Sequence, residues 1–312
     1  MRRPLLAKIV LLAFALLPIE ASAWNKPGHM VTGAIAYNEL KQLSPGTIPL
    51  VVSLLEQHPF YLTMWKPRID QLHLSGDDRD RFLFVFAARW PDDARDTPFH
   101  HELWHFINFP FKPPNQPPSV KTQKPKDENV IAAFKLNLQV LRTAQASKRD
   151  KAIALCWVFH LVGDVHQPLH TTALFSTVFP NGDRGGNLWF IKFGNGQATK
   201  LHAFWDGLIL DSEDFQAVSN RAIQLRGNPD LARTKLAELS EKNFEKWANP
   251  ESFAAAVQVA YRGGMLPASN DENHPATMPG DYLASAKQVA QRRNILAGYR
   301  LADLLPSLVG QH

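Results

Sequence analysis

Apolar residues recur at helical spacing over most of this chain. One such run begins near Ala152 and ends close to Asp164, and the same period predicts helices over residues 30–43, 48–57, 128–143 and 282–308. The apolar run from Phe82 to Trp90 fits either a helix or a strand, and we favour a helix. The pattern therefore predicts a mainly α protein.

Polar and turn-forming residues separate these helices. Residues 59–80 are polar and predicted to be irregular, whereas residues 112–127 are rich in proline and lysine and predict a surface loop without core residues. The alternating run from Leu188 to Phe193 lies between glycine-containing turns and predicts a small β-hairpin. The expected architecture is a single-domain helical bundle with one small β-hairpin.

The first 23 residues have the features of a signal peptide. Basic residues at the start precede an apolar stretch too short to span a bilayer, and Ala21-Ser22-Ala23 is typical of a cleavage site. We predict cleavage after Ala23, a functional domain over residues 24–312, and a secreted or periplasmic protein without a membrane anchor. An uncleaved anchor is the alternative.

Composition narrows this prediction only slightly. The net charge is +5, and the leader contributes about two of these charges, a mild excess that permits a polyanionic substrate without requiring one. The single cysteine, Cys156, excludes an intramolecular disulfide, and no Asn-x-Ser/Thr sequence is present. For an exported protein, these features favour a bacterial periplasm or the medium.

The end of the 152–164 run carries the first candidate chemistry. His160 and Asp164 are four residues apart on one helical face, and Pro168 ends the helix so that His170 projects from the following turn. Either these are buried core residues or they bind metal, and three in eleven positions favour metal. His166 points elsewhere, so we place it at the surface or behind the ligands.

Further candidates lie on both sides of this segment. His202 and Asp206 repeat the same spacing, Asp92 follows the apolar 82–90 run, and His105 stands among aromatic residues. An imidazole in such surroundings is either a buried neutral side chain or a ligand.

The predicted new N-terminus is a candidate chelator as well. Cleavage after Ala23 would give Trp24 a free α-amino group with a pKa near ~8, which a metal ion can deprotonate. His29 follows five residues later. Taken alone, His29 would be a surface residue at a helix start.

Together these motifs resemble a known family, the three-zinc, single-strand-specific nuclease/3′-nucleotidases, or type I nucleases, of fungi, plants and bacteria. The matching pieces occur in the family's order over most of the predicted mature chain: Trp24 with His29, Trp90-x-Asp92, His105-Phe106-Ile107, His160-x3-Asp164-x5-His170 around Gln167-Pro168-Leu169, Gly185-Gly186-Asn187, and His202-x3-Asp206.

The resemblance implies a mostly helical fold, shared with zinc-dependent phospholipase C, and three zinc ions. One zinc ion would be held by Asp92, His105, His160 and Asp164; a second by the Trp24 amine and carbonyl, His29 and the bridging Asp164; and a third by His170, His202 and Asp206. A water between the zinc ions sharing Asp164 would have its pKa lowered toward ~7 and attack phosphorus in line. Arg95 and the third zinc ion would stabilise the leaving 3′-oxygen, giving a 5′-phosphate.

The resemblance also implies substrate contacts. The substrates would be single-stranded DNA, RNA and nucleotides, with Phe106 stacking on a base. Asn108 stands where fungal members carry an aspartate, and Gly185 and Asn187 match the opposite wall of the base pocket. We expect a monomer without a stable protein partner.

Two other functions fit parts of the pattern. A zinc-dependent phospholipase C shares the N-terminal tryptophan, but its next ligand comes later and its last ligand is glutamate. A non-catalytic zinc-binding module is the other, although closed structural zinc sites are mostly built from cysteines.

Overall fold

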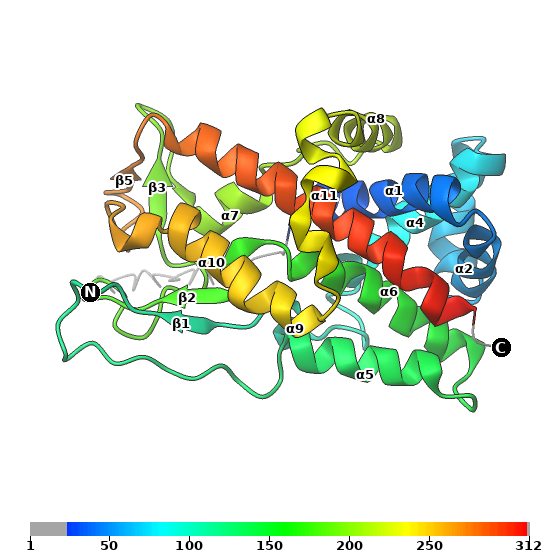
Figure 1. The fold of residues 1–312 in the computed structure, drawn as a ribbon, viewed down its shortest axis with the longest axis horizontal. Coiled ribbons are helices and arrows are strands. Elements are labelled where there is room, and N and C mark those ends of the chain that lie inside the picture. Colours follow the sequence, from blue (N-terminus) through cyan, green and yellow to red (C-terminus); the bar gives the residue numbers. More distant parts are fainter. Residues whose placement is uncertain (1–23, 311–312) are drawn as a thin grey trace, which may run out of the picture.

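The computed structural model describes residues 24–310 and shows a mainly α-helical protein (Figure 1), as predicted. The leader and the cleavage site after Ala23 lie outside the described residues. The helices are α1 (Lys26–Leu43), α2 (Thr47–Leu55), α3 (Lys66–Gln71), α4 (Gly76–Asp93), α5 (Val130–Arg142), α6 (Lys148–Asp164), α7 (Leu201–Asp206), α8 (Phe215–Arg226), α9 (Phe244–Lys246), α10 (Phe253–Ala255) and α11 (Tyr282–Val309).

Helix α6 lies inside the bundle, and its neighbours come from both halves of the chain. It packs against α4 and α5, and α1 packs against α4, α8 and the long C-terminal α11. Figure 1 shows α11 crossing the molecule in front of α6 and α1. From Leu155 to Asp164 every residue of α6 is buried, because helices cover it on all sides. Cys156 is among these residues and is a free thiol.

Helix α1 begins earlier than the apolar pattern predicts. The Asn25 side chain accepts a hydrogen bond from Gly28 N at 3.0 Å, and Pro27 stands in the first turn, where its missing N–H costs nothing. His29 is consequently inside the helix and completely buried. Its placement as a surface residue is wrong.

The predicted hairpin is present as β3 (Phe190–Lys192) and β4 (Thr199–Lys200), which pair antiparallel. Strand β5 (Ala276–Thr277) adds to β3 in parallel. A second, unpredicted sheet joins β1 (Phe109–Phe111) to β2 (Thr172–Leu174), also in parallel. Pairs of three-residue strands this far apart in sequence leave no periodicity from which to predict them.

The prediction of irregular structure over residues 59–80 is wrong. This segment contains a π-helical turn at Tyr61–Trp65, then α3 and the first turn of α4. Trp65 and Ile69, four residues apart, are buried against the core, and Pro67 stands near the start of α3. Packing of these two side chains outweighs the polar composition.

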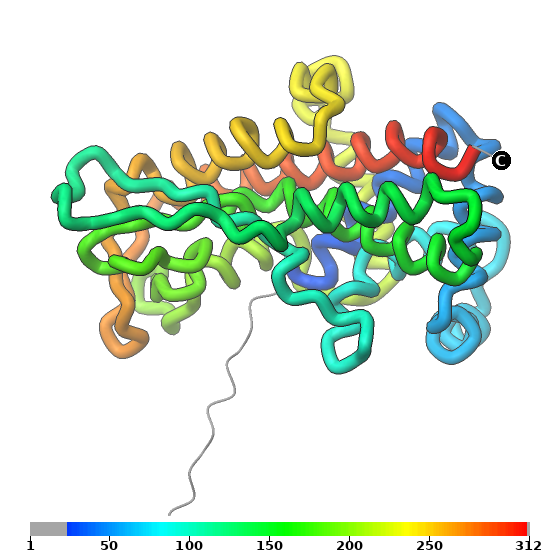
Figure 2. Tube along the Cα trace, turned by 90° about the horizontal axis from the view of Figure 1, so that it is seen from below, coloured from blue at the N-terminus to red at the C-terminus, as the bar shows by residue number. Residues whose placement is uncertain are grey.

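The proline- and lysine-rich loop is at the surface, without helix or strand over residues 112–127. It does, however, contribute to the core, contrary to prediction: Val120 is buried in a small apolar cluster with Ala173 and Phe175. Figure 2 shows the loop leaving β1 and returning along it toward α5.

Within the described part of the chain, none of the helices combines the length and apolar character needed to cross a bilayer.

Candidate metal centre

The candidate metal ligands gather at the C-terminal end of α6. Asp164 is the last residue of this helix, and the chain turns immediately afterwards into a short 3₁₀ helix at Pro168–His170. The predicted i,i+4 pair meets, with His160 Nε2 3.3 Å from Asp164 Oδ2. Helix α6 thus supplies His160 and Asp164 as candidate ligands, and the turn that follows it supplies His170.

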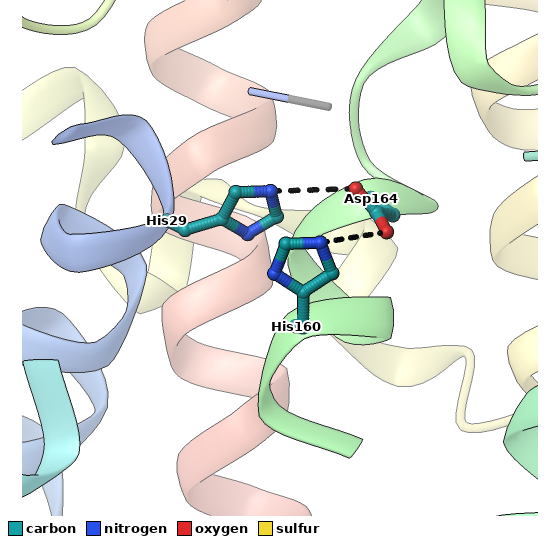
Figure 3. Close-up of side chains that lie close together, drawn as sticks. All are labelled: His29, His160 and Asp164. Atoms are coloured by element: carbon teal, nitrogen blue, oxygen red, sulfur yellow. Dashed lines mark ion pairs between the residues drawn. The ribbon is translucent and has the colours of Figure 1, made fainter. Parts of the chain in front are cut away.

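Asp164 is the centre of the first cluster, which Figure 3 shows in part. Its Oδ1 lies 3.3 Å from Nε2 of His29, from α1, and 3.5 Å from Nδ1 of His170. Its Oδ2 lies 3.3 Å from His160 Nε2 and from His105 Nδ1. Four imidazoles from four segments therefore surround one buried carboxylate.

Asp164 and His29 have polar atoms without a hydrogen-bond partner in the described part of the chain. Neither oxygen of Asp164 accepts a hydrogen bond with acceptable geometry from any residue in 24–310, and neither ring nitrogen of His29 makes one. Burial raises the pKa of Asp164 well above its ordinary value, and the charges of Asp92 and Asp206 raise it further. Burial lowers the pKa of His29, His105 and His160, so these rings are neutral. Neutral imidazoles can offer a lone pair to a metal ion, and a buried carboxylate is stabilised by positive charge. The cluster therefore fits a divalent cation.

The second cluster consists of His170, His202 and Asp206. The two Nε2 atoms face each other at 3.1 Å, while each Nδ1 bonds to a backbone carbonyl, His105 O at 2.7 Å and Gly185 O at 2.6 Å. Because each Nδ1 faces a carbonyl, Nδ1–H donates to it, and Nε2 is the nitrogen with which a neutral ring can bind a metal. Two Nε2 atoms that face each other in this way fit ligands of one cation. Asp206 Oδ2 lies 3.5 Å from His202 Nε2 and completes the set.

Asp92 joins the first cluster from the end of α4. Its carboxylate and the rings of His105 and His160 offer ligand atoms within 4.8 Å of one another. His160 Nδ1 donates to Ala88 O at 2.8 Å, so α4 also fixes the orientation of that ring. A guanidinium nitrogen of Arg95 lies 3.3 Å from Asp92 Oδ1, and the side chain is partly exposed. Arg95 is therefore placed at the edge of the cluster.

Trp24 lies between the two clusters. Its indole is completely buried and donates to Gly163 O at 3.1 Å, next to Asp164. The following residue, Asn25, donates from its backbone to Asp206 O at 3.2 Å. The start of the described chain is thus fixed beside both central carboxylates.

Comparison with known sequences agrees with this geometry. The sequence model of the S1/P1 nuclease family matches residues 24–310. The chain belongs to the S1/P1 nuclease family. It is 28% identical to Endonuclease 4 of Arabidopsis thaliana over 311 residues, covering 91% of this chain and 89% of that protein. It is 25% identical to Nuclease S1 of Aspergillus oryzae over 256 residues, covering 77% and 83%.

In this S1/P1 nuclease, the predicted substrate residues lie around the clusters. Phe106 and Asn108 are partly exposed, and Ile107 between them donates from its backbone to His170 O at 2.7 Å. Asn187 is partly exposed, but its amide donates to Arg184 O at 2.9 Å within its own turn. Stacking of a base on Phe106 and base contacts with Asn108, Gly185 and Asn187 stay predictions.

Gly185 has a structural role that sequence reasoning missed. Its φ is +62°, and a Cβ there would come within 2.4 Å of Leu169 O, so only glycine fits this turn. Its carbonyl accepts the hydrogen bond that orients His202. The glycine pair in the motif is the signal from which this was predictable.

Gln167 was also missed as a residue that supports the nuclease site. Its amide donates to Asp206 Oδ1 at 2.7 Å, and its oxygen accepts from Leu169 N. This single side chain links the turn after α6 to the second cluster. The only sequence signal for this role of Gln167 was its position inside the metal-binding motif.

Of the two positions predicted for His166, at the surface or behind the ligands, the surface position is wrong. His166 is completely buried, donates to Val162 O at 2.7 Å, and receives a hydrogen bond from Arg300 at 2.8 Å. Arg293 and Arg300 of α11 both pair with Glu251, and Arg293 donates to His166 O at 3.2 Å. This buried ionic network holds the turn after Asp164 from the side away from the clusters.

Proposed function

We propose that this S1/P1 nuclease hydrolyses phosphodiester bonds of single-stranded DNA and RNA, leaves 5′-phosphates, and also removes the phosphate of 3′-nucleotides. The observation that carries the proposal is the Asp164 cluster. A buried carboxylate that accepts no hydrogen bond within residues 24–310, among four imidazoles, is stabilised in its charged form by bound cations. A site of this kind next to partly exposed Arg95 and Phe106 suits metal-assisted hydrolysis of an anionic substrate.

We infer that the cations are three zinc ions. Imidazole and carboxylate ligands are typical of zinc, and sets with three protein ligands are typical of its catalytic sites. The three groups of ligand atoms are His29, His160 and Asp164; Asp92, His105 and His160; and His170, His202 and Asp206. Bound zinc supplies Lewis-acid polarisation of a phosphoryl oxygen and lowers the pKa of a coordinated water toward ~7.

The chain's own residues supply binding and orientation. We infer that the Arg95 guanidinium binds a phosphoryl oxygen; the support is its position at the edge of the first cluster and the fit of its planar fork to phosphate. Phe106 offers a ring on which one base stacks. A duplex keeps its bases stacked inside and cannot present them to such a ring, which gives the preference for single strands.

The test is to measure zinc content and hydrolysis of single-stranded DNA, RNA, a matched duplex and phosphatidylcholine by protein starting at Trp24. We expect close to three zinc ions and cleavage of both single strands, with an Asp164→Asn variant losing about two of the zinc ions and cleavage. Hydrolysis of the lipid alone would assign the chain to phospholipase chemistry. Zinc binding without hydrolysis of any substrate would leave a metal-binding module.

We further propose that the enzyme is secreted or periplasmic, acts as a monomer, and is cleaved after Ala23. Its support is the leader's composition and the fixed position of Trp24 beside Asp164 and Asp206. The mass of protein expressed from the full sequence should correspond to a start at Trp24. A variant retaining Ala23 should bind one zinc ion more weakly, because a peptide nitrogen replaces the amine.

A further inference from the structure

Three unpaired lysines occupy one limb of the proline-rich loop. Lys121, Lys124 and Lys126 are exposed, and no ion pair links any of them to a carboxylate within residues 24–310. No acidic residue occurs in the stretch 112–126. We call residues 121–126 the lysine strap. It is a local concentration of positive charge on a chain whose overall charge is mild.

The lysine strap is held at both ends. At its start, Val120 packs with Ala173 and Phe175, and its carbonyl accepts from Lys112 Nζ at 2.9 Å. At its end, Val130 donates from its backbone to Phe106 O at 3.0 Å. The Asn129 amide also donates to Lys126 O at 2.7 Å. Anchored ends and a proline within the strap restrict its backbone, so the three lysines stay on one short segment.

These anchors place the strap beside the metal centre. Ala173 and Phe175 follow His170 by three and five residues, and Phe106 is adjacent to His105. The strap therefore runs from the far end of β2 back toward the backbone of Phe106. Figure 2 shows the loop that contains it returning toward α5. From Lys121 to Lys126 the strap spans at most about 17 Å. Lys126 precedes by four residues Val130, whose backbone N–H bonds to Phe106 O.

We propose that the lysine strap binds the phosphates of a single strand on nucleotides beyond the one held at Phe106. This inference rests on the proposed function and adds an extended subsite to it. Exposed lysines without ion-pair partners can neutralise phosphates without breaking existing contacts, and the counterions released favour binding. An anchored row of charges next to the scissile position gives longer substrates an advantage over dinucleotides.

The experiment is steady-state kinetics of the zinc-loaded enzyme on a 20-nucleotide single strand and on a dinucleotide, over a salt series. In a Lys121→Gln, Lys124→Gln, Lys126→Gln variant, kcat/KM on the long strand should fall about tenfold at low salt. The slope of log kcat/KM against log salt should become shallower by about 2, since each phosphate contact on a single strand contributes roughly 0.7. The dinucleotide should be cleaved at the wild-type rate.

A matched control removes the same charge elsewhere, through Lys148→Gln, Lys235→Gln and Lys287→Gln, three exposed lysines on other elements. It should keep the wild-type salt slope. Equal loss on both substrates, an unchanged slope in the strap variant, or the same change in the control would overturn the inference. So would a strap variant that loses only binding to anionic phospholipid vesicles. Absence of any cleavage by the wild type would instead contradict the proposed function.

Discussion

The two carboxylates at the metal centre differ in how the protein holds them. Asp206 accepts a hydrogen bond from Gln167 at 2.7 Å, and one oxygen remains near His202. Asp164 accepts none within the described chain and has four ring nitrogens at 3.3 to 3.5 Å. Asp206 is positioned by a protein side chain, whereas Asp164 depends on bound cations to balance its charge. Asp164 should therefore control metal binding, whereas the zinc affinity at Asp206 should depend on the neighbouring Gln167.

The largest effects on zinc content and activity are expected from a comparison of Asp164→Asn with Asp206→Asn. The Asp164 variant should lose about two of the three zinc ions, because its carboxylate faces ligands of two groups, and the Asp206 variant about one. We expect kcat/KM to fall by ~10³-fold or more for Asp164→Asn, since metal ions contribute several kcal/mol to such reactions. Metal analysis and single-strand cleavage measure both effects. Equal zinc loss in the two variants would remove the distinction between the sites.

Gln167→Ala sharpens the comparison from the Asp206 side. Losing the amide that holds Asp206 should weaken zinc binding at the second cluster by roughly 10–100-fold and leave the Asp164 sites nearly unchanged. Competition with a chelator of known affinity measures this. Gln216→Ala, which removes an exposed amide on α8, is the control and should have no effect. Weakening of all three sites alike would show that Gln167 acts on the turn as a whole.

Gly163→Ala tests the Asp164 cluster through its packing. A Cβ at this position would lie 2.6 Å from His29 Nδ1, so the ring must shift from its position beside Asp164. We expect about tenfold weaker zinc binding at this cluster, although alanine normally stabilises a helix by up to ~1 kcal/mol over glycine. Gly46→Ala, with no atom within 4 Å of the new Cβ, is the matched control. Unchanged zinc affinity in Gly163→Ala would mean that His29 is not a ligand.

The smallest effect concerns the pH dependence of stability in the metal-free protein. Burial raises the pKa of Asp164 above its ordinary 3.8, so the folded state binds this proton more tightly than the unfolded chain. The free energy of unfolding should fall as pH rises from about 3.8 through the raised pKa, by up to ~1.4 kcal/mol per pH unit.

Asp164→Asn should flatten this slope and make the metal-free protein more stable than wild type at neutral pH. Asp206 also has a raised pKa, and the buried histidines with lowered pKa contribute the opposite slope below about 6.5. Denaturant unfolding over a pH series of both metal-free proteins isolates the Asp164 part. Identical pH slopes of the unfolding free energy in the two proteins would show that the buried Asp164 carboxylate does not destabilise the metal-free protein.

The sequence by itself determined most helices and the candidate ligands. Apolar period predicts α5, α6 and α11 because their buried faces repeat every three to four residues. The i,i+4 spacing brings His160 to Asp164 because both lie on one turn of one helix. Such features are local, so neighbouring residues suffice to predict them.

Only the tertiary structure decided how the ligands combine and what supports them. His29, His105 and His170 reach Asp164 because α1, the 3₁₀ turn at Glu102–His105 and the turn after α6 pack around it. Carbonyls that orient His160 and His202 belong to segments distant in sequence, and so does the amide that holds Asp206. Backbone carbonyls carry no residue-type signal. The parallel β1–β2 pair and the burial of His166 could not be predicted either, because both follow from packing between segments distant in sequence.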